Sequence, residues 1–187
     1  MNRFGEPCGI DPARRLSPCT VARVTTTERY DVLTAPRPAW RGRMHQWAFV
    51  FSIPAGILLI VGADHAAAHV AAAVYAGSLL ALFGTSAAYH RLAQSYRSRA
   101  IMQRLDHSMI YVLIAGTYVP ICLLALPRGW GVPLLSVVGG LAVVGIIIKV
   151  VAFRKLAWIG YALYPIMGWC AIVAAPAIGS SLSTLQI

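Results

Sequence analysis

Five long apolar stretches, separated by short polar segments, occupy most of the chain beyond residue 45. A helix rises about 1.5 Å per residue, so each stretch is long enough to cross most or all of a hydrocarbon layer about 30 Å thick. The alternation of apolar and polar segments therefore predicts five membrane-spanning helices. The stretches cover residues 46–63, 70–89, 108–126, 132–153 and 157–177.

The segments that flank these stretches refine the predicted topology. Residues 64–69 form a short polar hairpin, and a longer basic linker precedes the third span. Pro120 predicts a kink inside the third span, because proline cannot donate a backbone hydrogen bond. Lys149 lies near the end of the fourth span, where we expect its long side chain to reach the membrane surface. Residues 176–187 are expected to form a loop or the first turns of a partial sixth span.

The composition agrees with a membrane protein and excludes a soluble globular enzyme. Hydrophobic residues make up 58% of the chain and charged residues only 12%, whereas an ordinary soluble domain carries about 25% charged residues. The predicted fold class is all-α: a polytopic transmembrane helix bundle that occupies residues 39–187. The four cysteines show no C-x-x-C spacing, and we expect free thiols.

Basic residues are distributed unevenly between the two sides of this topology. The chain carries 16 Lys and Arg against 6 Asp and Glu, which gives a net charge of +10. Because the basic residues lie between apolar stretches and not on one common face, we expect membrane lipids and no nucleic acid as partners. Fifteen basic residues fall on one side and only Arg128 on the other. The positive-inside rule therefore predicts a multi-pass protein of the plasma (inner) membrane with a cytoplasmic N-terminus.

Residues 1–38 differ in composition from the rest of the chain. They are rich in Arg and Pro, and they lack the apolar run of roughly 7 to 15 residues that a secretory signal requires. They also show neither the helical nor the strand period of apolar positions. We therefore expect a disordered, basic cytoplasmic tail that is retained in the protein.

Three polar residues near the cytoplasmic ends of the second and third predicted spans are candidates for chemistry. Ser86 and His90 lie four residues apart and therefore on one face of a helix. Asp106 is expected to open the third span at the same membrane level, and the linker can close at modest entropic cost. A carboxylate within a span costs about 2.5 to 3.5 kcal/mol on insertion scales, so its presence suggests a function. Metal binding in a shared pocket is one such function.

Each candidate also has a purely structural interpretation. Asp106 could act as the N-cap of the third span, His90 could be an interfacial residue, and Ser86 could pack between helices or bond to its own backbone. His65 and His69 lie in the polar hairpin, where we expect them to be solvated.

Several motifs, taken together and in this order, resemble the hemolysin III family. That family belongs with the progestin and adipoQ receptors, in a larger group of membrane proteins that resemble ceramidases. The resemblance runs from about residue 39 to the C-terminus. The motifs are Arg41-Gly42-Arg43-Met44-His45, Ser86-Ala87-Ala88-Tyr89-His90-Arg91, Leu105-Asp106-His107-Ser108-Met109-Ile110-Tyr111, Ile114-Ala115-Gly116-Thr117-Tyr118-Val119-Pro120 and Tyr164-Pro165-Ile166-Met167-Gly168-Trp169.

The resemblance implies a seven-helix bundle that holds a zinc ion near its cytoplasmic side. It implies a metal-ligating His on the second helix, matched by His90, and a nearby Ser, matched by Ser86. It further implies that the Asp of the third helix, matched by Asp106, holds a metal-bound water in hydrolase-like chemistry on a lipid amide or ester. Ser86 and Asp106 are thus the implied catalytic residues, His90 is the implied metal ligand, and zinc is the implied cofactor.

The sequence departs from the family pattern in one respect. Two further His ligands are expected from an H-x-x-x-H pair on a seventh helix, and no such pair follows the fifth predicted span. A catalytic zinc needs about three protein ligands. His45, His107 or a second copy of the chain could supply donors, although we expect His45 to be a pocket or interface residue. We therefore expect a shortened version of the seven-helix fold that binds zinc weakly or not at all, lacks the hydrolase activity and accumulates poorly.

Two functions are consistent with these observations. The first is that of a zinc-dependent membrane lipid amidase or hydrolase, in shortened form. The second is that of a non-enzymatic membrane protein, either a cytolytic factor, as the family name suggests, or a component that tunes bilayer properties. A transporter is disfavoured because the spans show no inverted repeat. A pore is disfavoured because no span carries a charged stripe.

Overall fold

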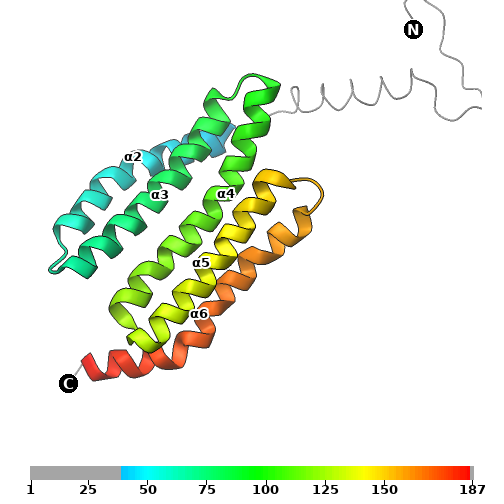
Figure 1. Cartoon of the computed structure of the whole chain (residues 1–187). Coiled ribbons are helices and arrows are strands. Elements are labelled where there is room, and N and C mark those ends of the chain that lie inside the picture. Colours follow the sequence, from blue (N-terminus) through cyan, green and yellow to red (C-terminus); the bar gives the residue numbers. More distant parts are fainter. Residues whose placement is uncertain (1–38, 186–187) are drawn as a thin grey trace, which may run out of the picture. The chain divides into compact units, whose positions relative to one another are not determined.

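The computed structural model describes residues 39–185, and every regular element in that range is a helix. Five helical segments are long and apolar enough to cross a membrane. The predicted all-α polytopic bundle is therefore confirmed, whereas the tail predicted for residues 1–38 lies outside the described residues. The elements are α2 (Ala39–Val61), α3 (Ala66–Leu92), α4 (Tyr96–Pro120), η1 (Ile121–Ala125), α5 (Arg128–Val151) and α6 (Ala157–Leu185), and they follow one another along the bundle (Figure 1).

Helices α2 and α3 form an antiparallel hairpin with close backbone contacts. A Cβ built at Gly56 of α2 would lie 2.9 Å from the Ala76 Cβ of α3, and one built at Gly42 would lie 3.0 Å from the His90 Cβ. Small residues allow membrane helices to approach closely enough for extensive van der Waals contact. The two contacts are at opposite ends of α2, so the hairpin is closely packed along most of its length.

Helix α4 begins well before the apolar part of its span. Its first residue is Tyr96, and Ser95 is the N-cap. The Ser95 hydroxyl accepts a hydrogen bond from the Ser98 amide, and the Ser98 hydroxyl accepts one from the Ser95 amide, both at 3.1 Å. This reciprocal capping satisfies amides that have no partner within the helix, and it explains why the polar first turns are helical. The prediction that Asp106 opens this helix, and the alternative that it is the N-cap, are both wrong.

Pro120 marks a change of helix type instead of a simple kink. A proline removes one backbone hydrogen bond and crowds the preceding turn, and here the chain passes from α4 into the wider turns of η1. Gly131 of α5 lies directly against the carbonyl of Cys122 in η1, where a side chain would not fit. The neighbouring helix thus accommodates the altered backbone, as π-helical turns in membrane helices require.

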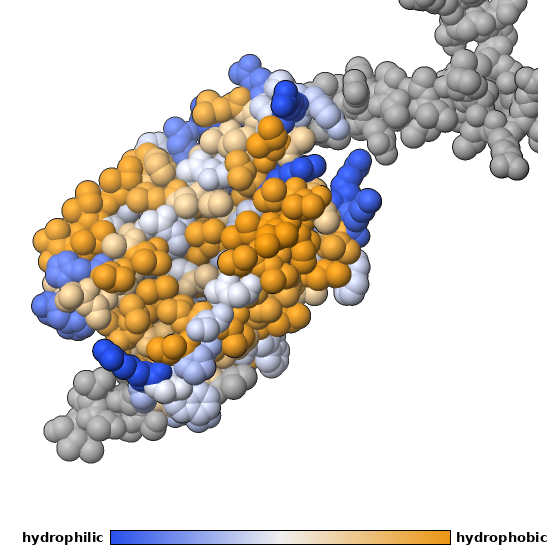
Figure 2. Space-filling view, in the orientation of Figure 1, coloured by the Kyte–Doolittle hydropathy of each residue, from blue (hydrophilic) through white to orange (hydrophobic). Residues whose placement is uncertain are grey.

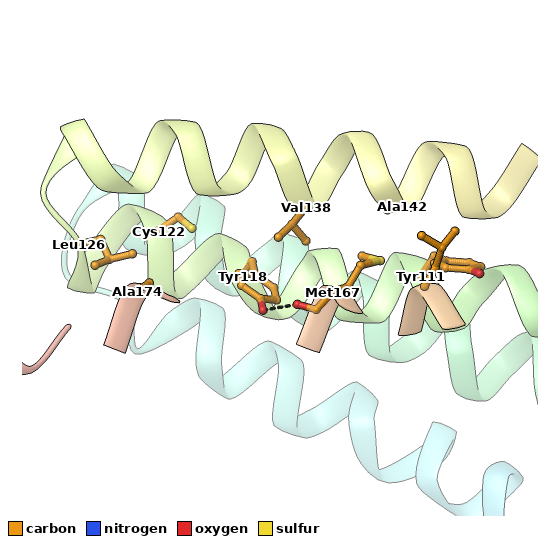
Figure 3. Packing of buried hydrophobic residues seen from close by; sticks show 9 residues of the cluster. Tyr111, Tyr118, Cys122, Leu126, Val138, Ala142, Met167 and Ala174 are labelled. Carbon is orange, nitrogen blue, oxygen red and sulfur yellow. Dashed lines mark hydrogen bonds between the residues drawn. The ribbon is translucent and has the colours of Figure 1, made fainter. Parts of the chain in front are cut away.

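Helices α4, α5 and α6 enclose the hydrophobic core of the described residues. Figure 3 shows Tyr118 of α4, Val138 of α5 and Met167 of α6 turned toward one another. The Tyr118 hydroxyl donates a hydrogen bond to the Met167 carbonyl at 2.5 Å, and the Tyr111 hydroxyl donates one to the carbonyl of Gly160. Buried hydroxyls need such partners, since water does not reach them. The aromatic side chains of α4 therefore tie it to α6.

Lys149 lies inside this part of the bundle and not at the membrane surface. Its side chain is 0% exposed, and its Nζ has no hydrogen-bond partner among the described residues. The ammonium group lies 3.7 Å from the centroid of the Tyr161 ring. Gly160 makes room for the stem, because a Cβ there would lie 2.8 Å from the Lys149 Cε. The prediction that Lys149 reaches the surface is therefore wrong, and the small residue on α6 is the reason.

Helix α6 continues beyond the end of the predicted fifth span. It runs to Leu185 as one element that contains Pro165 and Pro176. Residues 176–185, which belong to the segment expected to form a loop or a partial sixth span, are thus part of α6. The C-terminal part, red in Figure 1, turns away from the direction of the first part. Prolines inside a helix are a common cause of such bends.

Large apolar side chains cover the outside of the helices. Hydrophobic residues dominate the face seen in Figure 2, and the exposed ones include Trp47, Phe51 and Leu58 of α2 and Val143 and Ile147 of α5. Soluble proteins rarely expose apolar patches larger than a few hundred Å². The chain is a multi-pass membrane protein, and its apolar surface contacts lipids.

Candidate functional site

Basic residues gather at one end of the helical unit. Nine of the ten Lys and Arg between residues 39 and 185 lie near the start of α2 or α4, or near the end of α3 or α5. The exception is Arg128, at the start of α5 and the opposite end. Figure 2 shows blue, hydrophilic atoms where α3 joins α4. The three predicted site residues lie toward this basic end.

Ser86 of α3 is buried against α2. It is 2% exposed, and its Oγ lies 2.6 Å from Nδ1 of His45, within hydrogen-bond distance. The His45 ring also contacts Phe83 of α3, with 5.7 Å between the ring centroids. His45 is thereby fixed between the two helices, next to the predicted site.

His90 lies one turn beyond Ser86 on the same side of α3. Its Cβ is close to Gly42 of α2, and its ring centroid is 4.9 Å from that of Tyr89. Since Gly42 precedes His45 by three residues, both imidazoles belong to the contact between α2 and α3. The structure therefore brings together His45, Ser86 and His90, which we call the hairpin cluster.

The contact of His45 with Ser86 was only partly accessible from the sequence. The predicted polar hairpin of residues 64–69 is centred between residues 66 and 67, which places position 45 opposite position 88, two residues from Ser86. Helix register therefore predicts that the two residues are near each other, but not that their side chains meet. The sequence analysis considered His45 as a possible additional metal donor and expected a pocket or interface residue, but it did not predict the contact with Ser86.

Asp106 lies within α4, at the level of the hairpin cluster. Gly116 of α4 lies directly against the Ser78 side chain of α3. Helices α3 and α4 are antiparallel, so ten residues before Gly116 on α4 is the same membrane level as ten residues after Ser78 on α3. Asp106 is therefore level with residue 88, between Ser86 and His90. The Tyr164 hydroxyl of α6 donates a hydrogen bond to the carbonyl of His107, the residue after Asp106, at 2.9 Å. The expected membrane level is thus supported by this register, while the shared pocket with Ser86 and His90 stays a prediction.

Other histidines lie away from the hairpin cluster. The Nδ1 of His107 is 2.8 Å from the Gln103 carbonyl, and its ring edge contacts Phe153 after α5. His65 and His69 have H-x-x-x-H spacing, but they are exposed at the start of α3, at the other end of the hairpin. The His65 side chain caps α3 by accepting a hydrogen bond from the Ala68 amide at 3.3 Å. His65 therefore has a structural role as the cap of α3, and both histidines lie at the end of the hairpin opposite the hairpin cluster.

The donors described so far do not complete a catalytic zinc site. Zinc in enzymes is held by about three protein ligands, commonly imidazole nitrogens and carboxylate oxygens. Within residues 39–185, no three His, Cys, Asp or Glu side chains converge closely enough to hold a metal ion. The hairpin cluster contains two imidazoles, and the metal role predicted for His90 stays a prediction.

Comparison with known proteins agrees with the motifs. The model of the family described as haemolysin-III related matches residues 33–186. Over 142 residues, the chain is 34% identical to the hemolysin-3 homolog of Bacillus subtilis (strain 168), covering 74% of this chain and 66% of the relative. Over 144 residues, it is 38% identical to hemolysin-3 of Bacillus cereus, covering 74% of this chain and 64% of the relative. The chain thus spans slightly less than two thirds of these curated relatives, and no solved structure matches it.

Proposed function

Because the chain belongs to the haemolysin-III related family, we propose that its basic end carries part of a zinc site of the hydrolase-like type that the motifs imply. The hydrogen-bonded pair of His45 and Ser86, at 2.6 Å, is the observation that supports this proposal most directly. The pair fixes a buried hydroxyl and an imidazole at the membrane level of Asp106.

The basic residues support a particular orientation in the membrane. Nine of the ten basic residues of the described part lie at the end that holds the hairpin cluster. Lys and Arg are retained on the cytoplasmic side of bacterial and other membranes during insertion. We therefore propose that this protein lies in the plasma (inner) membrane, with its N-terminus and the hairpin cluster on the cytoplasmic side.

The residues of the site have different proposed roles. His90 supplies an imidazole nitrogen to the metal, and His45 supplies a second one or orients Ser86. The Ser86 hydroxyl, held by His45, presents a hydrogen-bonding group beside the metal position. The Asp106 carboxylate can hold and orient a water molecule from α4. Zinc, when bound, supplies a Lewis acid and a nucleophile at neutral pH.

The incomplete donor set limits what residues 39–185 can do by themselves. Two imidazoles are fewer than the ligands of a catalytic zinc site, so we propose that these residues alone bind zinc weakly. Hydrolysis of a lipid amide or ester is accordingly proposed only for a protein in which further donors complete the set.

A non-enzymatic role in the membrane is the second candidate. It is favoured by the absence of three converging ligands among the described residues, and one relative bears the name hemolysin-3. In this alternative, the hairpin cluster is a packing device between α2 and α3, and the protein acts on the bilayer as a cytolytic factor or by tuning its properties.

Zinc content separates these proposals. The full chain is purified in detergent and dialysed to equilibrium against a series of zinc concentrations, and the protein-bound zinc is measured by mass spectrometry as the excess over the dialysis buffer. We expect zinc affinity to fall about tenfold or more in His90→Ala, and to fall less in His45→Ala. The matched control is His69→Ala, which changes an exposed histidine at the other end of α3 and should leave zinc affinity unchanged. Equal zinc in the wild type, His90→Ala and His69→Ala would refute a metal role for His90.

Leakage from vesicles tests the alternative. The purified chain is reconstituted into vesicles that contain a self-quenched dye, and release is measured at increasing ratios of protein to lipid. A lytic protein releases dye in a manner that His90→Ala leaves unchanged. Intact vesicles at the highest ratio would exclude the cytolytic role.

A further inference from the structure

A cavity with both polar and apolar walls opens at the basic end of the α2–α3 hairpin, beside the hairpin cluster. Its volume is about 370 Å³, and it is lined by Arg43, Gln46, Trp47 and Val50 of α2 and by Arg91 of α3. None of these five residues belongs to the hairpin cluster. The cavity therefore needs its own explanation.

The Arg91 side chain is positioned by its neighbours on α2. Its Nη1 donates a hydrogen bond to Oε1 of Gln46 at 2.5 Å. Gly42 lets the stem of Arg91 lie close to α2, since a Cβ at position 42 would lie 3.4 Å from the Arg91 Cγ. A guanidinium held in this way loses less conformational entropy when it binds a ligand.

Neither α2 nor α3, the two helices that line the cavity, carries an acidic residue at this end that could pair with the guanidinium groups of Arg43 and Arg91. Residues 39–185 contain only two carboxylate side chains. Asp64 lies in the loop at the far end of α2 and α3, and Asp106 lies within α4. Two arginines that face one cavity favour an anion, and the planar guanidinium matches the oxygen geometry of a phosphate.

The apolar wall of the cavity indicates that the anion is the phosphate of a lipid and not a free phosphate ion. Trp47 is 62% exposed, and its ring stacks with that of Phe51, with 6.0 Å between the centroids. Val50 and Phe51 continue this exposed apolar surface along α2, away from the basic end. Tryptophan at the membrane interface, with basic residues on one side and apolar residues on the other, matches a lipid with an anionic headgroup and acyl chains.

We propose that this cavity binds an anionic phospholipid. The phosphate contacts Arg43 and Arg91, and the acyl chains lie along the exposed face of Trp47, Val50 and Phe51. The inference is independent of zinc, because none of these side chains is a metal donor in the proposed site. A bound lipid would also bridge α2 and α3 at the level of the hairpin cluster.

Native mass spectrometry of the full chain in detergent tests this proposal. The wild type is titrated with phosphatidylglycerol and with phosphatidylcholine of the same acyl chains, at about 0.2 M ammonium acetate. We expect tighter binding of phosphatidylglycerol. Each of Arg43→Gln and Arg91→Gln should weaken that binding about fivefold, which corresponds to roughly 1 kcal/mol per basic residue near an anionic lipid surface.

Control variants separate this site from a general charge effect. Arg97→Gln removes an exposed charge in the first turn of α4, outside the cavity, and should weaken phosphatidylglycerol binding less than twofold. Arg91→Lys retains the charge but loses the planar fork, and we expect an intermediate affinity. It also shows whether a loss in Arg91→Gln comes from misfolding, because a lysine at this exposed position should fold normally.

Three results would overturn the proposal. The first is equal phosphatidylglycerol affinity in the wild type, Arg43→Gln and Arg91→Gln. The second is equal affinity of the wild type for phosphatidylcholine and phosphatidylglycerol. The third is displacement of phosphatidylglycerol by millimolar inorganic phosphate, which would assign the cavity to a free anion instead of a lipid.

Discussion

Helix α2 packs on α3 alone, whereas α4, α5 and α6 enclose a common core. Only 6% of the spanning part of α2 is buried, against 28% of the part that contains α4 and η1. The hairpin is held by glycine contacts and by side-chain hydrogen bonds that include those between His45 and Ser86 and between Arg91 and Gln46. The core is held by buried aromatic residues whose hydroxyls bond to backbone carbonyls. The comparison indicates that α2 can move against its neighbour more easily than α4 can.

This difference matters for the location of the candidate site. The hairpin cluster and the lipid cavity both lie where the less buried helix meets α3. Regions with few buried contacts open more readily than cores do. A site built there can admit a lipid or a metal ion at a smaller cost than one between α4, α5 and α6.

The largest expected effect tests how tightly the core is packed. Gly145 of α5 lies directly against the ring of Tyr111, so Gly145→Ala forces the ring to shift. Overpacking of this kind costs about 1 to 3 kcal/mol. We expect a clear fall in the midpoint of thermal unfolding in detergent, followed by the fluorescence of a thiol-reactive dye.

The matched control for this change is Gly140→Ala on the same helix. No atom lies within 4 Å of a Cβ built at Gly140, and alanine favours a helix by up to about 1 kcal/mol relative to glycine. The control should be neutral or stabilising. Equal losses for both variants would contradict the close packing of α5 on α4.

The second prediction concerns the buried charge of the core. Burial of the Lys149 ammonium in the last turn of α5 costs at most about 2.5 to 3.5 kcal/mol, the value for the centre of a span, and the contact with Tyr161 offsets about 2 kcal/mol of it. Lys149→Met keeps the shape and removes the charge, so we expect a gain in stability of about 1 kcal/mol. The thermal midpoint in detergent measures it. Lys155→Met, at an exposed position, should change little, and a loss in Lys149→Met would show that the ammonium has a partner.

The smallest effect concerns the bond that fixes α2. Hydrogen bonds between membrane helices contribute about 0.6 kcal/mol on average and at most about 1.7. A double-mutant cycle of His45→Ala and Ser86→Ala should give a coupling energy in this range. Thermal unfolding provides the four free energies, and limited proteolysis of the α2–α3 loop should show faster cleavage in each variant. Additive effects would indicate that the two side chains do not interact.

The sequence was sufficient to predict the number, order and class of the helices. Five apolar stretches appear as five spanning helices, because hydropathy detects the residues that face lipid. The start of α4 was missed because its first turns contain Arg97, Arg99 and Arg104, which hydropathy excludes from a span. The signal that was present is the pair of serines at positions 95 and 98, whose mutual capping starts the helix.

The positions of the candidate residues were predicted in part, whereas their role in a site stays a prediction. Ser86 and His90 were recognised from their spacing on one face, and the level of Asp106 agrees with the helix register. Neither the buried position of Lys149 nor the contact of His45 with Ser86 was predicted, because both depend on a partner helix. A glycine at position 160 makes room for Lys149, and the length of the α2–α3 turn sets the register of His45.

The early start of α4 has a mechanical consequence. Together with η1, it forms a rod of 30 residues from Tyr96 to Ala125, which is about 45 Å long at 1.5 Å per residue. That length equals the full thickness of a bilayer with its headgroups, about 40–45 Å. When the membrane thickens or thins, the water boundary can move along the arginine-bearing turns of this rod while its ends remain helical. The protein can therefore meet bilayers of different thickness with the water boundary at different turns of this one helix, without unwinding it.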